Sequence, residues 1–332
     1  MPKLSPADEL LNHQIPEPFT HVATHHDFWR ESLFFVFHPR DQLGDVEILT
    51  VSHYPKRQAM DAQQLGRVGK DPIFLWHNRP YGDDPHKPTV GPVSIDIIEP
   101  YKTILLKVDP ETSPLGMDIT FTARTQPYGL RRGTMKAGHE IIWDQSHMLQ
   151  SGTYNGTYTY KEKTYNVDNW WGQRDHSWGI RDHSRCPLWM WYAIQLPDGM
   201  FGVWHWEYPN GARVYTDGCF APADGSDPIP VVDFHHDLNW TGEDRQPVEY
   251  GLQGENVRGL AGHVDITLEN RQRIGIDAEG RWAQYYGTMG GGLHEMVVRT
   301  DDGREGTAIY EVTGAHHHHF FPEARAENLP PG

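Results

Sequence analysis

The chain has 332 residues, more than a single hydrophobic core usually organises, so we expect two domains. Its 29 basic and 45 acidic residues give a formal net charge of −16, which argues against nucleic acid or an anionic membrane surface as partner, because both need clustered lysine and arginine. No apolar run approaches the roughly 18 residues that span a bilayer. Two cysteines without a Cys-x-x-Cys motif suit a reducing compartment, so we expect a cytoplasmic protein with no membrane span.

Helical patterns are rare and short strands follow one another along the chain. Residues 5–11 predict the start of one short helix, with Ser5 as its N-cap and Pro6 in the first turn. In residues 117–124, Met117, Ile119 and Phe121 alternate with polar residues, as in a strand with one buried face. The other predicted strands cover residues 33–37, 45–52, 93–98, 103–108, 154–160, 163–167, 188–196, 200–208, 212–215, 264–268, 282–286, 295–299 and 307–312.

This spacing of strands favours an all-β architecture. Closely spaced strands with turn residues between them, and no alternating helices, are typical of sandwiches and closed barrels. We predict two successive antiparallel β-barrel domains, residues 1–170 and 171–332, with few short helices. The segment 170–187 has little strand pattern and many charges, so we expect it to lie at the junction of the domains.

The densest group of reactive side chains lies in residues 170–183, which hold three tryptophans, two aspartates, two arginines and two histidines. Asp175 and His176 offer a proton donor and a proton acceptor in one short segment. Burial against indole rings would raise the pKa of a carboxyl group, whereas a nearby arginine would lower it, and the sequence leaves the balance open. A structural alternative is an interdomain network of ion pairs among the same arginines and aspartates.

A second cluster, Trp204-His205-Trp206-Glu207-Tyr208, lies on a predicted strand. Alternation places His205 and Glu207 on one face and the two tryptophans on the other. If the first face points into a barrel, a histidine and a carboxylate meet a cavity; if it points out, the tryptophans line that cavity instead. Both orientations stay open at this stage.

We expect neither a metal nor an organic cofactor. The runs His25-His26-Asp27 and His235-His236-Asp237 place adjacent side chains on opposite faces of a strand, so neither readily supplies two ligands to one ion. Residues 316–319 are four histidines and are expected to bind metal only adventitiously. Gly-x-Gly-x-x-Gly, P-loop and Gly-x-Ser-x-Gly motifs are absent, which argues against nicotinamide, ATP and serine-hydrolase chemistry.

The segment Asp175-His176-Ser177-Trp178-Gly179 resembles the Asp-His-Asn-Trp-Gly motif of the carotenoid 1,2-hydratase (hydroxyneurosporene synthase) and AttH-like superfamily, in the form of an uncharacterised bacterial branch. The resemblance implies two tandem lipocalin-like (calycin) β-barrel domains. It also implies hydration of isolated alkenes, or cyclisation of polyketide-type chains, without an organic cofactor. It marks Asp175 as the general acid. Ser177 replaces the asparagine of the hydratases, which removes one amide that could orient substrate or water.

Together these observations predict a lyase or isomerase that hydrates or dehydrates a hydrophobic terpenoid, steroid or aromatic-like small molecule. The expected catalytic residues are Asp175, His176 and His205. The expected substrate-binding residues are Trp171, Trp178, Arg181, Trp191, Trp204, Trp206 and Glu207. A cyclase that preorganises a flexible chain and a non-catalytic carrier of an apolar ligand are the alternatives. A homodimer is left open.

Overall fold

The computed structural model describes residues 6–11, 13, 16, 26–81, 86–183, 185, 188–208, 211–251 and 253–314. The chain divides into two compact units. The first comprises residues 1–40, 44–134 and 143–181, and the second comprises residues 41–43, 135–142 and 182–332. Ser5, His25 and residues 316–319, discussed above, lie outside the described residues, as does Cys186, one of the two cysteines.

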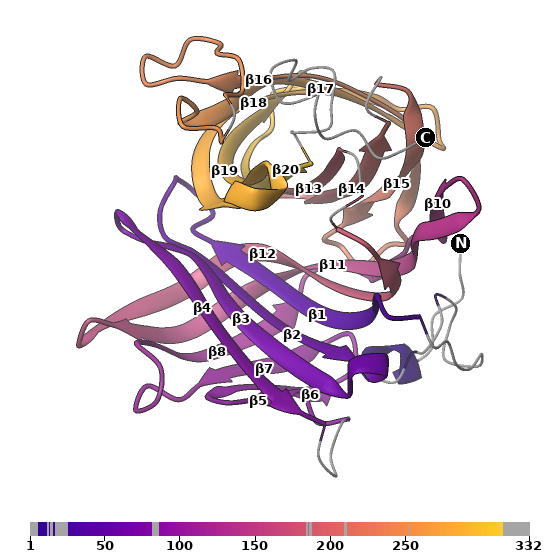
Figure 1. Ribbon diagram of the computed structural model, residues 1–332. Helices are drawn as coiled ribbons and strands as arrows, with labels where there is room; N and C mark the ends of the chain where they lie inside the picture. Colours follow the sequence, from indigo (N-terminus) through magenta and orange to yellow (C-terminus); the bar gives the residue numbers. More distant parts are fainter. Residues whose placement is uncertain are drawn as a thin grey trace. The chain divides into compact units, whose positions relative to one another are not determined.

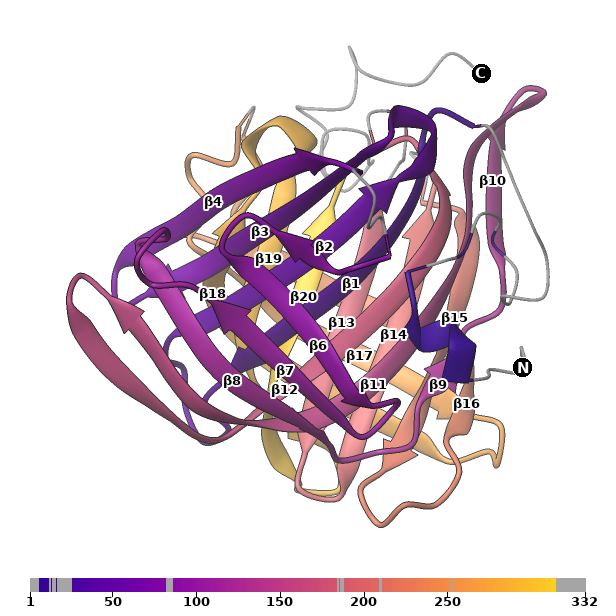
Figure 2. The same ribbon diagram turned by 90° about the horizontal axis from the view of Figure 1, so that it is seen from below.

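The first unit is built on a twelve-stranded antiparallel sheet with the order β4-β3-β2-β1-β12-β11-β8-β7-β6-β5, to which β9 and β10 add on β11. Figure 2 shows β4, β3, β2 and β1 side by side, followed by the long β11–β12 hairpin. The strands are β1 (Trp29–His38), β2 (Val46–Tyr54), β3 (Ala59–Val68), β4 (Asp71–Pro80), β5 (Thr89–Val90), β6 (Val93–Glu99), β7 (Thr103–Val108), β8 (Leu115–Ala123), β9 (Tyr128–Gly129), β10 (Gly133–Ala137), β11 (Glu140–Tyr160) and β12 (Lys163–Arg181).

The alternation of apolar and polar residues gives this sheet one apolar face, which encloses a single core. On β8, Met117, Ile119 and Phe121 are buried while Asp118 and Thr122 are exposed, as the sequence predicts. The apolar faces of β1, β2, β3, β6, β7, β8 and β11 contribute to the same cluster of buried residues. The two ends of the strand order also meet, because β5 contacts β3 and β4. The Arg79 side chain of β4 donates to the carbonyl oxygen of Thr89 on β5 at 2.7 Å.

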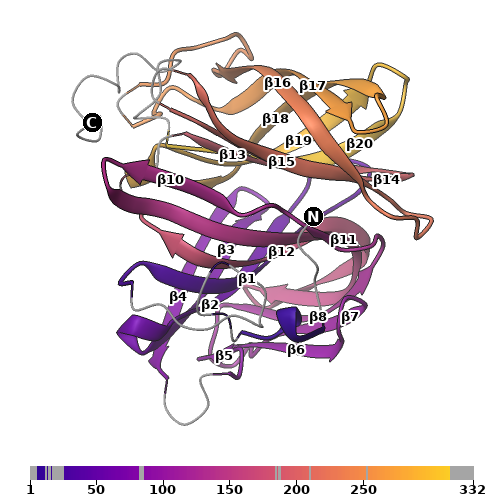
Figure 3. The ribbon, with the colours of Figure 1, turned by 90° about the vertical axis from the view of Figure 1, so that its right-hand side faces the viewer.

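The second unit is a closed eight-stranded barrel, β13 to β20, in which every strand pairs with its neighbours in sequence and β20 returns to β13. Figure 1 shows these strands arranged as a ring, and Figure 3 shows β16 and β17 running side by side. The strands are β13 (Trp189–Leu196), β14 (Gly199–Glu207), β15 (Arg213–Pro222), β16 (Ile229–Thr241), β17 (Gly259–Leu268), β18 (Arg273–Tyr285), β19 (Gly291–Thr300) and β20 (Glu305–Thr313).

The prediction of an all-β fold of two barrel-like domains is therefore confirmed. The helices of the described chain are three short 3₁₀ turns, η1 (Pro6–Glu9), η2 (Pro55–Arg57) and η3 (Gly287–Met289). No helix among the described residues has the length and apolar character that crossing a bilayer requires.

The motif segment differs from the expectation of a linker. Residues 172–180 form the second half of β12, a strand of the first unit, and the division between the units falls after Arg181 rather than at residue 170. The sequence does not predict this strand, because buried polar side chains lie on both of its faces and apolar residues do not alternate with polar ones. Gly179 has φ +139°, and a Cβ there would lie 2.2 Å from the carbonyl oxygen of Asp144 on β11, so the motif glycine is needed for close strand pairing.

Candidate functional site: a buried carboxylate with three histidines

Alternation along β12 sorts the motif onto two faces. The side chains of Arg174, His176 and Trp178 point into the first unit, where His176 contacts Glu31 of β1 and Trp178 stacks on His13. The intervening residues point the other way. Asp175 lies opposite Phe34 and Leu149, and the Ser177 hydroxyl lies 3.2 Å from that of Ser32. The expectation that Asp175 and His176 face one site together is therefore not met, because successive strand residues point to opposite faces.

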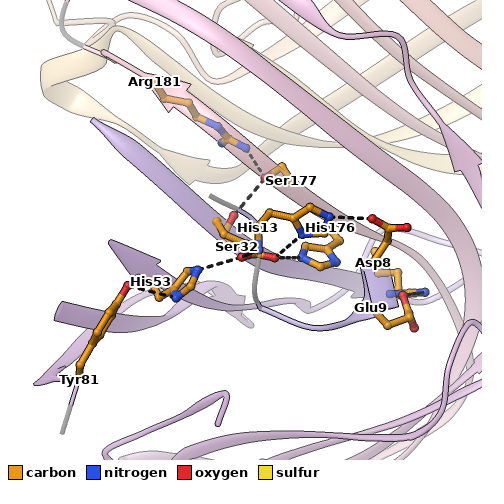
Figure 4. A network of polar contacts seen from close by, with 11 residues as sticks. Asp8, Glu9, His13, Ser32, His53, Tyr81, His176, Ser177 and Arg181 are labelled. Carbon is orange, nitrogen blue, oxygen red and sulfur yellow. Dashed lines mark hydrogen bonds and ion pairs between the residues drawn. The ribbon is translucent and has the colours of Figure 1, made fainter. Parts of the chain in front are cut away.

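Glu31 is the centre of the inward-facing group. Its Oε1 accepts hydrogen bonds from His13 Nδ1 and His176 Nε2, both at 2.8 Å. Its Oε2 accepts from the main-chain N–H of His13 at 2.7 Å and from His53 Nε2 at 2.8 Å. The side chains of Glu31, His13 and His176 are completely shielded from solvent. Figure 4 shows the three labelled histidines around this point. One carboxylate thus collects four N–H donors from three separate parts of the chain.

These contacts fix the charge of Glu31. Burial alone would raise the pKa of its carboxyl group, but the hydrogen bonds from His13, His176 and His53 outweigh burial and hold that pKa far below its usual range. Glu31 is therefore a carboxylate near neutral pH.

His13 is held as the counter-ion of that carboxylate. Burial would lower the pKa of its imidazole, but hydrogen bonds to Asp8 and Glu31 raise it above the usual value. Nδ1 lies 2.8 Å from Glu31 and Nε2 lies 2.7 Å from Asp8. Because both ring nitrogens face carboxylates, both must donate, and the ring is an imidazolium. Trp178 stacks on this ring with centroids 3.9 Å apart and an interplanar angle of 14°.

His176 differs from His13 in having one unused ring nitrogen. Its Nε2 donates to Glu31, whereas its Nδ1 is buried and has no hydrogen-bond partner among the described residues. In its neutral form the ring therefore carries its proton on Nε2 and a lone pair on Nδ1. A carboxylate that fixes the tautomer of a histidine is the arrangement that general bases use. The His13 and His176 rings are 5.6 Å apart and nearly perpendicular.

His53 connects the carboxylate to a less buried group. Its Nε2 donates to Glu31, and its Nδ1 lies 3.2 Å from the hydroxyl of Tyr81, which is half-buried just after β4. Among the described side chains joined to Glu31 in this way, Tyr81 is the most exposed. The order Glu31, His53, Tyr81 is thus a short chain of hydrogen bonds from the buried carboxylate toward solvent (Figure 4).

A buried ion pair ties η1 to the same face of β12. Arg174 Nη2 donates to Glu9 Oε1 at 2.8 Å, and both side chains have no exposed area. Gln150 Oε1 accepts from Arg174 Nε at 3.0 Å and Nη2 at 2.8 Å, and the main-chain N–H of Tyr101 donates to the other Glu9 oxygen at 2.8 Å. Because η1 carries Asp8 as well as Glu9, this pair positions the carboxylate that holds His13.

Two predicted binding residues lie on the opposite face of β12 from this cluster. Arg181 donates to Ser177, lies 3.2 Å from His147 Nε2, and stands over the Trp143 ring at 5.6 Å. Trp171 stacks under the guanidinium of Arg124 at 4.5 Å. Of the residues predicted in the motif, His176 and Trp178 meet at one centre, whereas Asp175, Arg181 and Trp171 do not reach it.

The cluster 204–208 is sorted in the same way by the second barrel. His205 and Glu207 lie on the face of β14 that carries the core residues Phe201 and Val203, so the inward orientation of the pair is the one observed. The expected pocket-lining role of the tryptophans is corrected for this barrel. They belong to the outward faces of β13 and β14, where cross-strand pairing places Trp191 beside Trp204 and alternation places Trp206 on the same face as Trp204.

Sequence reasoning missed the residues that make up most of the first cluster. Glu31 carried a usable signal, because it lies two residues before Leu33 and shares the alternation of Leu33 and Phe35, which puts a carboxyl group on a core face. His13 and His53 carried none, since their contacts with Glu31 span 18 and 22 residues and depend on tertiary structure.

The ligand atoms of His13, Glu31 and His176 lie within 4.8 Å of one another, so the cluster contains the donor types of a metal site. However, Glu31 already accepts four N–H groups, and Asp8 keeps the second nitrogen of His13 protonated. Both oxygens of Glu31 and both ring nitrogens of His13 are thus engaged, and Nδ1 of His176 is the ring nitrogen that the hydrogen bonds among the described residues leave without a partner, which fits proton transfer better than metal binding.

Comparison with known proteins identifies relatives by fold. The sequence model of a family of unknown function, DUF8625, matches residues 4–279. No curated protein matches the sequence. Among solved structures, an AttH-type protein from Nitrosomonas europaea superposes with a TM-score of 0.59 at 12% identity, covering 88% of this chain and 94% of the other.

Kievitone hydratase from Nectria haematococca superposes with a TM-score of 0.53 at 9% identity, covering 85% of this chain and 88% of its own. CghA with Sch210972 gives a TM-score of 0.52 at 9% identity, with 86% and 88% coverage. At these identities the likeness concerns the fold. It confirms the AttH-like part of the expected resemblance at that level, whereas a specific link with carotenoid 1,2-hydratase stays a prediction.

Proposed function

As this chain belongs to DUF8625, a family of unknown function, and shares its fold with a hydratase, we propose that it adds water to, or removes water from, a hydrophobic small molecule by acid–base chemistry. The observation that carries the proposal is the buried Glu31–His176 pair, with the Nδ1 of His176 left without a hydrogen-bond partner among the described residues. A general base requires such a lone pair on a ring whose other nitrogen is held by a carboxylate, and His176 combines the two.

In the hydration direction, Nδ1 of His176 would take a proton from water as the water oxygen bonds to one carbon of the substrate double bond. The same Nδ1–H would then protonate the neighbouring carbon, so that one water is added and the imidazole returns to its starting form. Dehydration is the reverse, with proton removal from carbon and proton delivery to the leaving hydroxyl. Omitting the water step gives isomerisation of the double bond.

The other members of the cluster would support this single imidazole. Glu31 holds its Nε2–H and stabilises the imidazolium that forms when Nδ1 is protonated. His13, protonated between Asp8 and Glu31, supplies a positive charge beside Glu31 and helps to keep that group a carboxylate. His53 and Tyr81 would let protons exchange between this buried centre and solvent.

The proposal departs from the sequence expectation in one respect. It assigns proton transfer to His176 and not to Asp175, because these side chains lie on opposite faces of β12. The substrate class, a terpenoid, steroid or aromatic-like molecule, stays a prediction from the sequence, and the printed name of the hydratase neighbour supports the type of reaction alone.

The test is a screen of hydrophobic alkenes and the matching alcohols with the purified chain in D₂O, read by mass spectrometry. Gain or loss of water marks hydration or dehydration, and deuterium uptake at carbon marks isomerisation. Once a substrate turns over, we expect His176→Gln to lower kcat by about 10²- to 10⁴-fold. Asp175→Asn, one residue away on the other face, is the matched control and should keep most activity.

Two outcomes would overturn the proposal. Loss of turnover in Asp175→Asn with normal turnover in His176→Gln would move the chemistry to the other face of β12. Tight binding of apolar ligands, with no mass change and no deuterium uptake across the screen, would identify the protein as a carrier.

A further inference from the structure

The second barrel contains a separate polar cluster that the proposed function does not use. His205 Nε2 lies 2.9 Å from Glu207 Oε1, and His236 Nε2 lies 3.0 Å from the same oxygen. The three side chains are between 3% and 8% exposed. Two imidazole nitrogens and a carboxylate oxygen therefore converge on one point of a barrel that also holds a large cluster of buried apolar side chains.

The fold fixes this convergence from three strands. His205 and Glu207 are two residues apart on β14, so both point inward. His236 comes from β16, and its ring centroid lies 5.8 Å from that of His205. Thr216 of β15 lies directly across from His205, and its hydroxyl is 2.7 Å from His205 Nδ1. The Nε2 of His205 is thereby aimed at Glu207 by a contact on its other nitrogen.

The barrel wall is incomplete beside this cluster. β15 and β16 pair through two residue pairs, Cys219 with Pro230 and Phe220 with Ile229, and residues 213–218 of β15 have no ladder partner on β16 in the described structure. The strands are held there by Arg213, which donates to Asp233 at 2.9 Å and to the Phe234 carbonyl oxygen at 2.6 Å. Along this stretch side-chain contacts join the two strands in place of a hydrogen-bonded ladder.

We infer that His205, Glu207 and His236 bind one divalent transition-metal ion of the zinc class. Two neutral imidazoles and one carboxylate form a common three-ligand set for such ions, with a fourth position for water. All three ligand atoms lie within 4.8 Å of one another. Metal–ligand bonds of about 2.0–2.1 Å in a tetrahedral site separate the ligand atoms by about 3.3 Å. The distances from Glu207 Oε1 to His205 Nε2 (2.9 Å) and to His236 Nε2 (3.0 Å) therefore need to lengthen by only a few tenths of an ångström.

The hydrogen bond to Thr216 supports this assignment. A histidine that binds metal through Nε2 carries its proton on Nδ1 and usually donates it to a nearby oxygen, which orients the ring. The Thr216 hydroxyl is placed to accept that proton. In the first unit the equivalent histidine, His13, faces a carboxylate through each ring nitrogen and stays protonated, so the two clusters are suited to different partners.

The test is metal titration of the full chain with residues 316–319 changed to alanine, because that histidine run would bind ions itself. After removal of metal by a chelator, Co²⁺ should bind at one ion per chain with the visible absorption of a tetrahedral site, and Zn²⁺ should displace it. Zn²⁺ should also raise the Tm of the same protein, which reports binding without any substrate.

Glu207→Gln and His236→Gln should each abolish the tetrahedral spectrum, and Thr216→Val should weaken binding by about 10- to 100-fold. His263→Gln is the matched control, because His263 is a half-exposed histidine of the same barrel that contacts Asp277 at 2.7 Å. It should leave the spectrum and affinity unchanged.

Absence of a tetrahedral Co²⁺ spectrum in the parent protein, the full chain with residues 316–319 changed to alanine, would overturn the inference. So would a spectrum that survives Glu207→Gln and disappears in His176→Gln, since the ion would then occupy the first unit. The Tm of each variant without metal shows that the fold is retained, and the Zn²⁺ response of the parent decides the question even if one variant fails to fold.

Discussion

Replacing Glu31 by glutamine is the most informative change to the first unit. The amide keeps one acceptor oxygen and substitutes an NH₂ group for the other. Since each carboxylate oxygen of Glu31 accepts two N–H groups, two of the four donors lose their acceptor and the His13 imidazolium loses a neighbouring negative charge. Hydrogen bonds to a buried charge contribute about 1.5–3 kcal/mol each, so the two lost bonds cost about 3–6 kcal/mol.

That figure agrees with the roughly 3–5 kcal/mol that follows when one partner of a buried ion pair is removed. For a domain of about 150–250 residues, each kcal/mol lowers Tm by roughly 2–4 °C, so Glu31→Gln should lower the Tm of the first unit by roughly 6–24 °C. Calorimetry would measure the transition. Hydrogen exchange of peptides from β1 and β12 would assign it to the first unit.

Glu47 offers a matched control on the neighbouring strand β2. It is fully buried, neither of its carboxyl oxygens has a hydrogen-bond partner among the described residues, and burial together with the nearby Asp45 raises its pKa well above the usual range. Glu47 is therefore a neutral acid, and Glu47→Gln exchanges one neutral group for another of the same shape. We expect a change of about 1 kcal/mol or less. Equal and small effects of Glu31→Gln and Glu47→Gln would refute the account of Glu31 as a charged centre.

Three further predictions concern the same unit. The lowered pKa of Glu31 adds stability that is complete above about pH 4.5 and is lost as pH falls, whereas the raised pKa of His13 adds stability that is complete below about pH 6.5 and is lost as pH rises. The urea concentration at the unfolding midpoint should therefore be highest between these two pH values. A midpoint that climbs steadily to pH 8 would contradict this. Arg174→Met should lower the free energy of unfolding by about 3–5 kcal/mol, because it leaves the Glu9 carboxylate buried without its counter-charge. Adding Glu9→Met should restore most of that stability in the same urea assay. No recovery in the double variant would show that the broken ion pair is not the cause of the lost stability. Gly179→Ala should cost at least about 2 kcal/mol, because the new Cβ would lie 2.2 Å from a carbonyl oxygen of β11, and an unchanged Tm would contradict that geometry.

The fold was predictable where one face of a strand is apolar. β8 and the strands of the second barrel around the turn at residues 197–199 follow the period of two, and the structure places strands there. β16 was missed because His235, His236 and Asp237 hide its alternation. The second half of β12 was missed for a related reason, since polar side chains occupy both of its faces and give no apolar period.

The site was located by the motif but not resolved by it. His176 and Trp178 were found because they lie in the dense segment, yet Asp175 was joined to them by nearness in sequence, which a strand converts into opposite faces. His236 was not predicted as a metal ligand, because its side chain and that of its neighbour His235 point to opposite faces of the strand and do not readily bind one ion together. The structure instead brings His236 to His205 and Glu207 from β14, a contact over 29 residues that no local pattern contains.

The central claim is the protonation pattern around Glu31, and nitrogen NMR of the folded chain with ¹⁵N-labelled histidine tests it without any substrate. Difference spectra against His13→Gln and His176→Gln would assign the two rings among the 21 histidines. We expect both nitrogens of His13 to be protonated, and the neutral form of His176 to carry its proton on Nε2 with the lone pair on Nδ1. A His13 ring with one bare nitrogen, or a His176 ring protonated on Nδ1 alone, would contradict the account.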